Sequence, residues 1–270
     1  MPDYNNQKVA FERVLDYLES SNQEDLEKGI SLDKIESIEF KNIDFAYNTD
    51  NVIKEFSLSI NSNDKVALVG KTGSGKSTII NLLCRFYDVT KGEILVNGKN
   101  INTYKFKDLR SRIGYVMQEN TIFDGTVLEN INYANLSLKE DTIINACKKI
   151  GLHEHIMKLP DGYKTNLKND GDILSSGEKQ LLCFARIMLT NPDIILLDEV
   201  TSSLSYETEM KIQSAIKEVT KNKMCIIVAH RLSTIRDCNK IVLMQDGKIE
   251  ETGTHNELMA KHRMYYELIR

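Results

Sequence analysis

The hydrophobic residues of the chain follow two periods, one typical of strands and one typical of helices. Residues 56–60 alternate between apolar and polar side chains, as in a strand with one buried face, and residues 38–40 and 93–96 form similar short patterns. Two other segments, residues 194–197 and 225–229, are apolar throughout, which is typical of parallel strands covered by helices on both faces. Residues 65–69 are typical of a further short buried strand. The pattern predicts an α/β fold in which an antiparallel β layer accompanies a parallel core sheet.

Helical spacing marks the first residues of the chain. The apolar face of residues 5–20 repeats at intervals of three and four positions and consists of Phe11, Val14, Leu15 and Leu18. Residues 21–34 are polar and acidic, and we predict that they form a linker. The leading helix either packs on its own domain or connects to something upstream, and the pattern favours neither interpretation.

Helical stretches return after residue 118, for example in residues 141–147. We therefore expect a helical subdomain inserted into the α/β core. The expected parts are a leading helix and linker in residues 1–34, a core in residues 35–117 and 185–270, and the helical subdomain in residues 118–184.

The charge and cysteine content of the 270 residues limit the classes of partner. The chain has 35 Lys and Arg against 39 Asp and Glu, a net charge of −4, which argues against binding to nucleic acid. No apolar run approaches the roughly 18 residues that a membrane-spanning helix needs. The five cysteines are widely spaced, which predicts buried reduced thiols in a cytosolic compartment. They are Cys84, Cys147, Cys183, Cys225 and Cys238.

A phosphate-binding loop is the most informative motif. Residues 70–77 read Gly-Lys-Thr-Gly-Ser-Gly-Lys-Ser and lie between the predicted strand 65–69 and a helical stretch that begins at Thr78. Glycines let the backbone curl so that successive N–H groups point at one anion, and the helix adds the positive end of its dipole. A glycine-rich structural turn is the weaker alternative, because a strand and a helix flank the loop as phosphate binding requires.

The ligand expected at this loop is ATP with Mg²⁺. Lys76 would reach the β- and γ-phosphates and take part in catalysis, and Ser77 would offer its hydroxyl to Mg²⁺. The cofactor-binding residues expected here are Gly70, Thr72, Gly73, Ser74, Gly75, Lys76, Ser77 and Thr78.

Candidate catalytic groups follow the later apolar strands. Asp198 and Glu199 come directly after residues 194–197, at the strand end where open parallel sheets place their ligands. Asp198 would hold Mg²⁺ and Glu199 would polarise the attacking water, whereas the alternative is that both acids cap a helix. His230, after another strand, would donate to a γ-phosphate, although a lone histidine in such a place is usually structural. Gln118 would contact Mg²⁺ or its water.

The stretch Leu174-Ser175-Ser176-Gly177-Glu178-Lys179-Gln180 resembles the signature motif of ATP-binding-cassette (ABC) ATPases. The resemblance extends from about residue 35 to the C-terminus and implies a P-loop NTPase fold, with a RecA-like parallel core, an antiparallel β layer and a helical subdomain. It also implies roles for individual residues. Tyr47 matches the adenine-stacking aromatic, Gln118 the glutamine loop, Asp198 and Glu199 the magnesium-binding and catalytic acids, and His230 the switch histidine.

Two further segments resemble exporters rather than importers. Residues 123–131 match an exporter pattern, and residues 10–19 look like the connector from the last membrane helix. The resemblance therefore implies an ATPase motor domain that pairs head to tail with a second nucleotide-binding domain, identical or different. It also implies a transmembrane domain as partner and a place at the cytoplasmic face of the cell membrane.

The signature also has a local interpretation. Ser175 followed by Glu178 forms a capping box that starts a helix, whose apolar face consists of Leu181, Phe184, Ala185 and Met188. A cap alone would explain these residues. The resemblance adds that the Ser175 hydroxyl and the Gly177 N–H point at the γ-phosphate of ATP held by a second subunit.

Three places depart from the family pattern. Ser176 and Glu178 stand where glycine and glutamine are usual, Ser205 replaces an aspartate that couples the two sites, and residues 168–170 replace a loop with glycine and glutamate. A carboxylate in the first helical turn offsets part of the dipole that attracts phosphate. We expect an asymmetric dimer in which this chain has a complete catalytic face and lends a weaker signature, as in heterodimeric exporters.

Other functions remain as alternatives at this stage. A soluble ABC ATPase acting on nucleic acid or ribosomes is disfavoured, because the residues between Ser77 and Ser175 leave no room for a long coiled-coil arm. A regulatory module that holds ATP without hydrolysing it is favoured by Ser205 and Glu178 but opposed by Glu199. A phosphotransferase is disfavoured because no acceptor site can be recognised.

Overall fold

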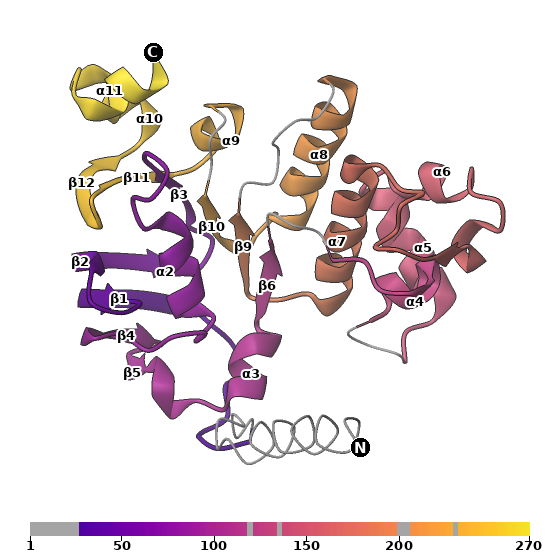
Figure 1. Cartoon of the computed structure of the whole chain (residues 1–270), viewed down its shortest axis with the longest axis horizontal. Coiled ribbons are helices and arrows are strands. Elements are labelled where there is room, and N and C mark those ends of the chain that lie inside the picture. The colour runs from indigo at the N-terminus through magenta and orange to yellow at the C-terminus, as the bar shows by residue number, and fades with distance from the viewer. Residues whose placement is uncertain (1–26, 118–120, 134–136, 199–205, 229–231) are drawn as a thin grey trace, which may run out of the picture.

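The computed structural model describes residues 27–117, 121–133, 137–198, 206–228 and 232–270. A six-stranded sheet contains residues 65–69, 194–197 and 225–228 of the predicted buried strands (Figure 1). Its strand order is β12-β11-β3-β10-β9-β6, and neighbours are parallel except β11 and β12. The strands are β3 (Lys65–Val69), β6 (Ile113–Val116), β9 (Ile194–Asp198), β10 (Met224–Val228), β11 (Lys240–Gln245) and β12 (Lys248–Gly253). The predicted parallel core sheet is confirmed.

The predicted antiparallel layer is a four-stranded sheet in the order β2-β1-β4-β5. Phe40 in its central strand pairs with Leu58 on one side and Ile94 on the other, so three apolar residues lie level across the sheet. The strands are β1 (Ser37–Ala46), β2 (Asn51–Asn61), β4 (Lys91–Val96) and β5 (Lys99–Asn100). A separate pair, β7 (Gly125–Thr126) and β8 (Asn166–Leu167), lies within the helical part and was not predicted.

The helices divide between the core and one side arm. In Figure 1, α4, α5 and α6 lie together beyond α7, on the side opposite the C-terminal helices α10 and α11. The α-helices are α2 (Lys76–Leu83), α3 (Phe106–Ser111), α4 (Val127–Ile131), α5 (Glu140–Lys149), α6 (His153–Ile156), α7 (Ser176–Thr190), α8 (Tyr206–Val219), α9 (Leu232–Arg236), α10 (His255–Ala260) and α11 (Met264–Ile269). There are also two short 3₁₀ helices among the described residues, η1 (Ile101–Thr103) and η2 (Gly162–Lys164).

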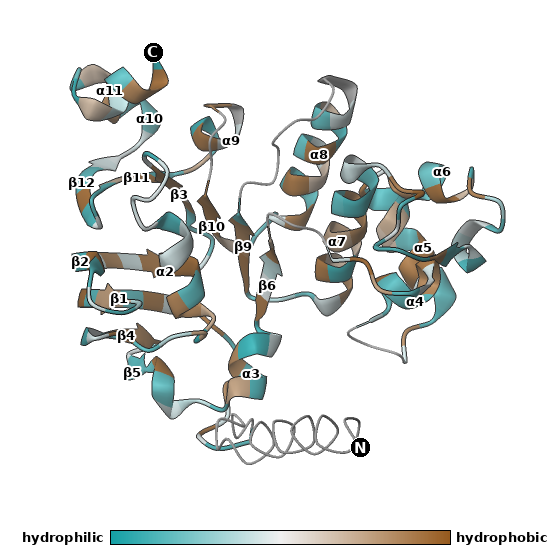
Figure 2. Cartoon of the chain, in the orientation of Figure 1, coloured by the Kyte–Doolittle hydropathy of each residue, from teal (hydrophilic) through white to brown (hydrophobic). Residues whose placement is uncertain are grey.

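Two apolar clusters lie on the two faces of the core sheet. Along β9, Ile195 and Leu197 join the cluster that contains α5, α7 and α8, whereas Ile194 and Leu196 join the cluster under β1, β2 and α2. Successive strand side chains point to opposite faces, so an entirely apolar strand is what a sheet covered on both sides requires. The brown strands at the centre of Figure 2 show this pattern.

Several expectations fall outside what the structure tests. The leading helix of residues 5–20 lies outside the described residues, and α7 runs without a break across the expected boundary between residues 184 and 185. The three-part division therefore stays a prediction. All five cysteines are free thiols, and four of them are buried as expected, whereas Cys183 is half-buried. No helix among the described residues combines the length and apolar character needed to cross a bilayer.

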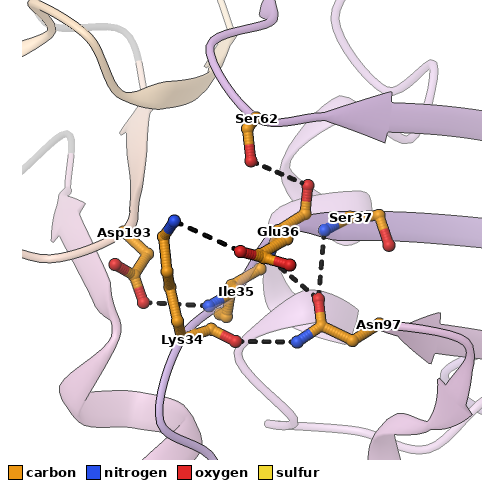
Figure 3. A network of polar contacts seen from close by, with 7 residues as sticks. All are labelled: Lys34, Ile35, Glu36, Ser37, Ser62, Asn97 and Asp193. Carbon is orange, nitrogen blue, oxygen red and sulfur yellow. Dashed lines mark hydrogen bonds and ion pairs between the residues drawn. The ribbon is translucent and has the colours of Figure 1, made fainter.

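A polar network fixes the start of the core, as Figure 3 shows. The Asn97 side chain accepts hydrogen bonds from the backbone N–H groups of Glu36 and Ser37 and donates one to the Lys34 carbonyl, at 2.8, 3.1 and 2.7 Å. Asp193 accepts from the Ile35 N–H at 2.9 Å, which joins this segment to the loop before β9. One asparagine between β4 and β5 therefore supports the first strand.

We expect Asn97→Ala to lower the free energy of unfolding by about 1–2 kcal/mol, because three exposed hydrogen bonds are lost and alanine must adopt a left-handed φ of 50°. Urea unfolding followed by circular dichroism measures the change. Asn63→Ala is the matched control, since Asn63 has a φ of 68° and no side-chain hydrogen bond among the described residues. If both variants lost the same free energy of unfolding, backbone strain alone would explain the effect.

Candidate functional site

The phosphate loop joins β3 to α2, as predicted. Gly75 caps α2 with φ 98° and ψ 6°, a left-handed conformation that disfavours any side chain. A Cβ on Gly70, whose φ is 147°, would lie 2.2 Å from the Met244 carbonyl oxygen. Glycine is therefore required at both positions, by conformation at Gly75 and additionally by close approach to β11 at Gly70.

The Lys76 ammonium lies over the loop that it follows. Its Nζ donates to the carbonyl oxygens of Gly70 and Lys71, each at 2.9 Å, and to the Ser74 Oγ at 3.4 Å. Lys76 is only 6% exposed, and Ser74 is equally buried. The positive charge of Lys76 therefore lies within the turn of the phosphate loop. A phosphate oxygen could replace the two backbone carbonyl oxygens as its hydrogen-bond acceptors.

Asp198 ends β9 and faces the start of α2. Its Oδ1 accepts from the Ser77 Oγ at 3.3 Å, and its Oδ2 accepts from the Tyr115 hydroxyl of β6 at 3.4 Å. The strand register places Asp198 level with Val228 of β10, and Val228 level with Leu68 of β3. The carboxyl ends of these strands therefore form one edge, with the phosphate loop and the acid close together, as predicted.

The pair Ser77 and Asp198 fits a magnesium site. Both supply oxygen, the donor that Mg²⁺ prefers, and Mg²⁺ is usually held by one or two carboxylates together with phosphates and water. Burial, and then the Asp198 charge, raise the pKa of Tyr115, so its hydroxyl keeps the proton that it donates to the acid. Tyr115 therefore donates to Oδ2 of Asp198, and Oδ1 of the same carboxylate faces Ser77.

Three predicted site residues lie outside the described residues. They are Gln118, Glu199 and His230, and Ser205 is outside them as well. Their roles as metal ligand, catalytic base and phosphate donor stay predictions. Glu199 is nevertheless adjacent in sequence to Asp198, whose position is described.

Tyr47 lies over the first turns of α2. Its hydroxyl is 3.3 Å from the Thr78 Oγ1 and accepts from the Asn81 side chain at 3.4 Å. Its ring, 44% exposed, meets Phe45 and Tyr87 edge to face, each at a centroid distance of 4.9 Å. An exposed aromatic ring anchored beside the phosphate loop provides the surface on which a base could stack.

The predicted capping box at the signature is confirmed. Ser175 is the N-cap of α7, its Oγ accepting from the Glu178 N–H, while its own N–H and hydroxyl donate to Glu178 Oε2 at 2.8 and 2.7 Å. Leu181, Phe184 and Ala185 are buried as the helical pattern predicts, whereas Met188 of the same predicted face is half-buried. Gly177 is buried in the first turn.

The loop before the signature contacts two functional segments. The Asp170 carboxylate accepts from the Ile122 N–H at 3.0 Å and from the Lys179 ammonium at 3.4 Å. The Ile122 hydrogen bond is the main cause of a lowered pKa for Asp170, which keeps the acid ionised. Residues 168–170, one of the departures from the family pattern, thus connect the signature helix to the segment that follows Gln118.

A cavity of about 610 Å³ lies beside the phosphate loop. It is lined by Gly70, Lys71, Thr72, Gly73, Ser74, Leu243, Met244, Gln245, Asp246, Met264, Glu267 and Leu268. These residues belong to the loop, the end of β11 and α11, and none belongs to α7. Among the described residues, Ser175 and Gly177 therefore do not share this cavity with the loop.

Sequence reasoning missed several residues that complete these contacts. Tyr87 supports the Tyr47 ring, Tyr115 holds Asp198, and His155 contacts Glu178 through its Nδ1 at 3.0 Å. None of the three belongs to a recognisable motif. Their contacts are with residues from other parts of the fold, and hydrophobic periodicity in the sequence does not predict such contacts.

Comparisons with known proteins give one consistent result. A family model described as ABC transporter matches residues 53–202. Curated proteins described as multidrug export ATP-binding/permease proteins, from Staphylococcus aureus strains NCTC 8325 and Mu50, are 44% identical over 250 residues. That alignment covers 90% of this chain and 43% of each relative, so the chain spans less than half of their length.

A solved structure is also similar over nearly the whole chain. It is described as a bacterial Atm1-family ABC exporter with ATP bound, with a TM-score of 0.87 and 32% sequence identity. The match covers 97% of this chain and 47% of that chain. Sequence and fold thus point to the same group of proteins.

Proposed function

The chain belongs to the ABC transporter family, and from this we propose that it is the ATP-hydrolysing motor domain of an exporter. The observation that carries the proposal is the edge formed by the phosphate loop and Asp198, with Lys76 and Ser77 facing it. A glycine-rich turn of purely structural use would need neither a buried lysine nor a carboxylate opposite its serine.

The chemistry follows from groups that face this edge. Lys76 would exchange the two loop carbonyls for phosphate oxygens, and Ser77 would turn its hydroxyl oxygen from Asp198 toward Mg²⁺. The bound Mg²⁺ would neutralise charge on the phosphates. Glu199 would accept a proton from the water that attacks the γ-phosphorus, while the bond to the β-phosphate oxygen breaks and ADP leaves. Gln118 and His230 would help to position the metal and the γ-phosphate.

The partners of this motor domain are also part of the proposal. Ser175 and Gly177 would face ATP bound by a second nucleotide-binding domain, as the family resemblance implies, and neither lines the cavity beside this chain's own phosphate loop. ATP hydrolysis would drive a transmembrane domain like the permease part of the relatives, and the chain would then lie at the cytoplasmic face of the cell membrane. ATP and Mg²⁺ are the cofactors, and nucleic acid is not a partner.

A shared site makes hydrolysis depend on protein concentration. We expect the ATPase rate per chain to rise over about a hundredfold range of protein concentration and then to level off, because only paired chains have complete sites. A coupled assay for ADP release at saturating Mg-ATP measures the rate. A rate per chain that does not change with dilution would contradict the head-to-tail model.

A regulatory subunit that holds ATP without hydrolysing it is the second candidate. One observation favours it for a pair of identical chains, since the Ser175 hydroxyl, which would face the ATP of the other chain, donates to Glu178 within its own helix turn. Single-turnover hydrolysis separates the two functions, because a regulatory module would release intact ATP whereas a motor domain would convert bound ATP to ADP.

A further inference from the structure

The acid at the end of β9 has a partner on the neighbouring strand. The phenol of Tyr115, in β6, donates to Asp198 Oδ2 at 3.4 Å, and the Ser77 Oγ donates to Asp198 Oδ1 at 3.3 Å. Asp198 itself is only 7% exposed. Two hydroxyl groups, one from α2 and one from β6, therefore contact the two oxygens of one buried carboxylate.

The strand pairing explains why this tyrosine reaches the acid. Tyr115 lies level with Leu196 of β9, two residues before Asp198. Side chains two positions apart on a strand point to the same face of the sheet. Tyr115 and Leu196 both pack in the apolar cluster under α2, whereas Val116 belongs to the cluster on the opposite face. Tyr115 and Asp198 therefore share the face that α2 covers, and the long phenol spans the offset of two residues.

A magnesium site needs a carboxylate that is held in one orientation. Mg²⁺ demands near-ideal octahedral geometry, and a hydrogen-bond partner behind a ligand fixes the orientation of that ligand. Ser77 would leave Asp198 when its hydroxyl oxygen turns toward the metal. The Tyr115 contact involves the other carboxylate oxygen and would remain.

We propose that Tyr115 is a positioning residue of the magnesium site, whose hydroxyl holds Oδ2 of Asp198 so that Oδ1 stays directed toward Ser77 and a metal bound beside it. Tyr115 acts through Asp198 and is not itself a metal ligand. The inference rests on the proposed function, because it assigns Tyr115 to the metal half of the ATP site. It concerns metal binding by a single chain, so its test does not depend on pairing with a second domain.

The competing explanation is that Asp198 only provides an acceptor for a half-buried phenol. The hydroxyl would then matter for stability but not for the metal. Tyr104 is a tyrosine of that kind, since it is 4% exposed and its hydroxyl donates to the Val96 carbonyl at 2.9 Å. Tyr104→Phe is the matched control for Tyr115→Phe, because each change removes one hydroxyl from a tyrosine of the same apolar cluster.

The test measures metal affinity through nucleotide binding. A fluorescent ATP analogue is titrated with the chain in EDTA and at a series of Mg²⁺ concentrations. We expect Tyr115→Phe to raise the Mg²⁺ concentration that gives half of the gain in affinity about tenfold, because loss of a partner behind a metal ligand typically costs 10–100-fold. The dissociation constant in EDTA should change less than about twofold, since Lys76 and its loop are untouched.

The rate of hydrolysis gives a second measurement. In Tyr115→Phe the Mg²⁺ concentration for half-maximal rate should rise by a similar factor, whereas kcat at saturating Mg²⁺ should change less than about threefold. In an Asp198→Asn background, Tyr115→Phe should shift the Mg²⁺ dependence of analogue binding by less than about twofold, because an effect that acts through the carboxylate needs the carboxylate. Tyr104→Phe should leave the Mg²⁺ dependence of binding and of rate unchanged.

The outcomes are distinguishable. An unchanged Mg²⁺ dependence in Tyr115→Phe would overturn the positioning role while leaving the motor function intact. The same shift in Tyr104→Phe, or an equal shift in the Asp198→Asn background, would overturn it as well. If Mg²⁺ does not raise the affinity of the unmodified chain for the analogue and the chain hydrolyses no ATP at any concentration, the proposed function fails, and this inference fails with it.

Discussion

Glu199→Gln is expected to lower the rate of ATP hydrolysis by about 10²–10⁴-fold, the usual contribution of a positioned general base, while ATP still binds. Glutamine keeps the size of the side chain but cannot accept a proton from water. The groups that bind the phosphates and the metal, Lys76 and Asp198, are unchanged. Single-turnover release of labelled phosphate measures the chemical step, and titration with a fluorescent ATP analogue measures binding.

The matched control is Glu218→Gln, the same change at an exposed glutamate near the end of α8. Its rate should equal that of the unmodified chain. Hydrolysis by Glu199→Gln at more than about a third of the normal rate would remove Glu199 from the role of base. The regulatory function would instead be supported if the unmodified chain were already as slow as the variant.

The phosphate loop and the signature cap could be predicted because their determinants are local. Gly75, Lys76 and Ser77 are neighbours in sequence, and their conformations follow from the turn into α2. Ser175 and Glu178 lie one helical turn apart, so the capping box needs no information from the rest of the chain. The apolar run 194–197 of β9 could be predicted equally well, because a strand buried on both faces is apolar along its length up to the terminal Asp198.

Contacts between distant segments could not be predicted in this way. Tyr115 is 83 positions from Asp198, and the hydrogen bond between them depends on the parallel pairing of β6 with β9. His155 and Glu178 meet only because α6 and α7 fold into the same side arm. The strands β7 and β8 have two residues each, too short for any alternation to show.

The structure changes the interpretation of Glu178, which stands where the family usually has glutamine. From the sequence, a carboxylate in the first turn predicts a weakened attraction for phosphate. The structure gives that carboxylate two sets of partners, Ser175 on one oxygen and His155 on the other. The carboxylate of Glu178 therefore already has partners on both oxygens, one of which is a side chain outside the motif that the motif alone does not reveal.

Lys76→Ala is expected to weaken ATP binding by about 10²-fold or more, because a charge-assisted contact with the phosphates is worth up to about 3 kcal/mol. The buried position of the ammonium raises its effect, since few water molecules screen it. Titration with a fluorescent ATP analogue measures the dissociation constant.

Lys71→Ala serves as the control, since it removes the same charge from an exposed side chain in the same loop. Its dissociation constant should change by less than about threefold, as exposed charges contribute little. Lys76→Met, which keeps the apolar stem, tests whether the loss reflects the charge or the fold. Normal affinity in Lys76→Met would show that the ammonium does not hold the phosphates, and the loop would then act through its backbone N–H groups alone.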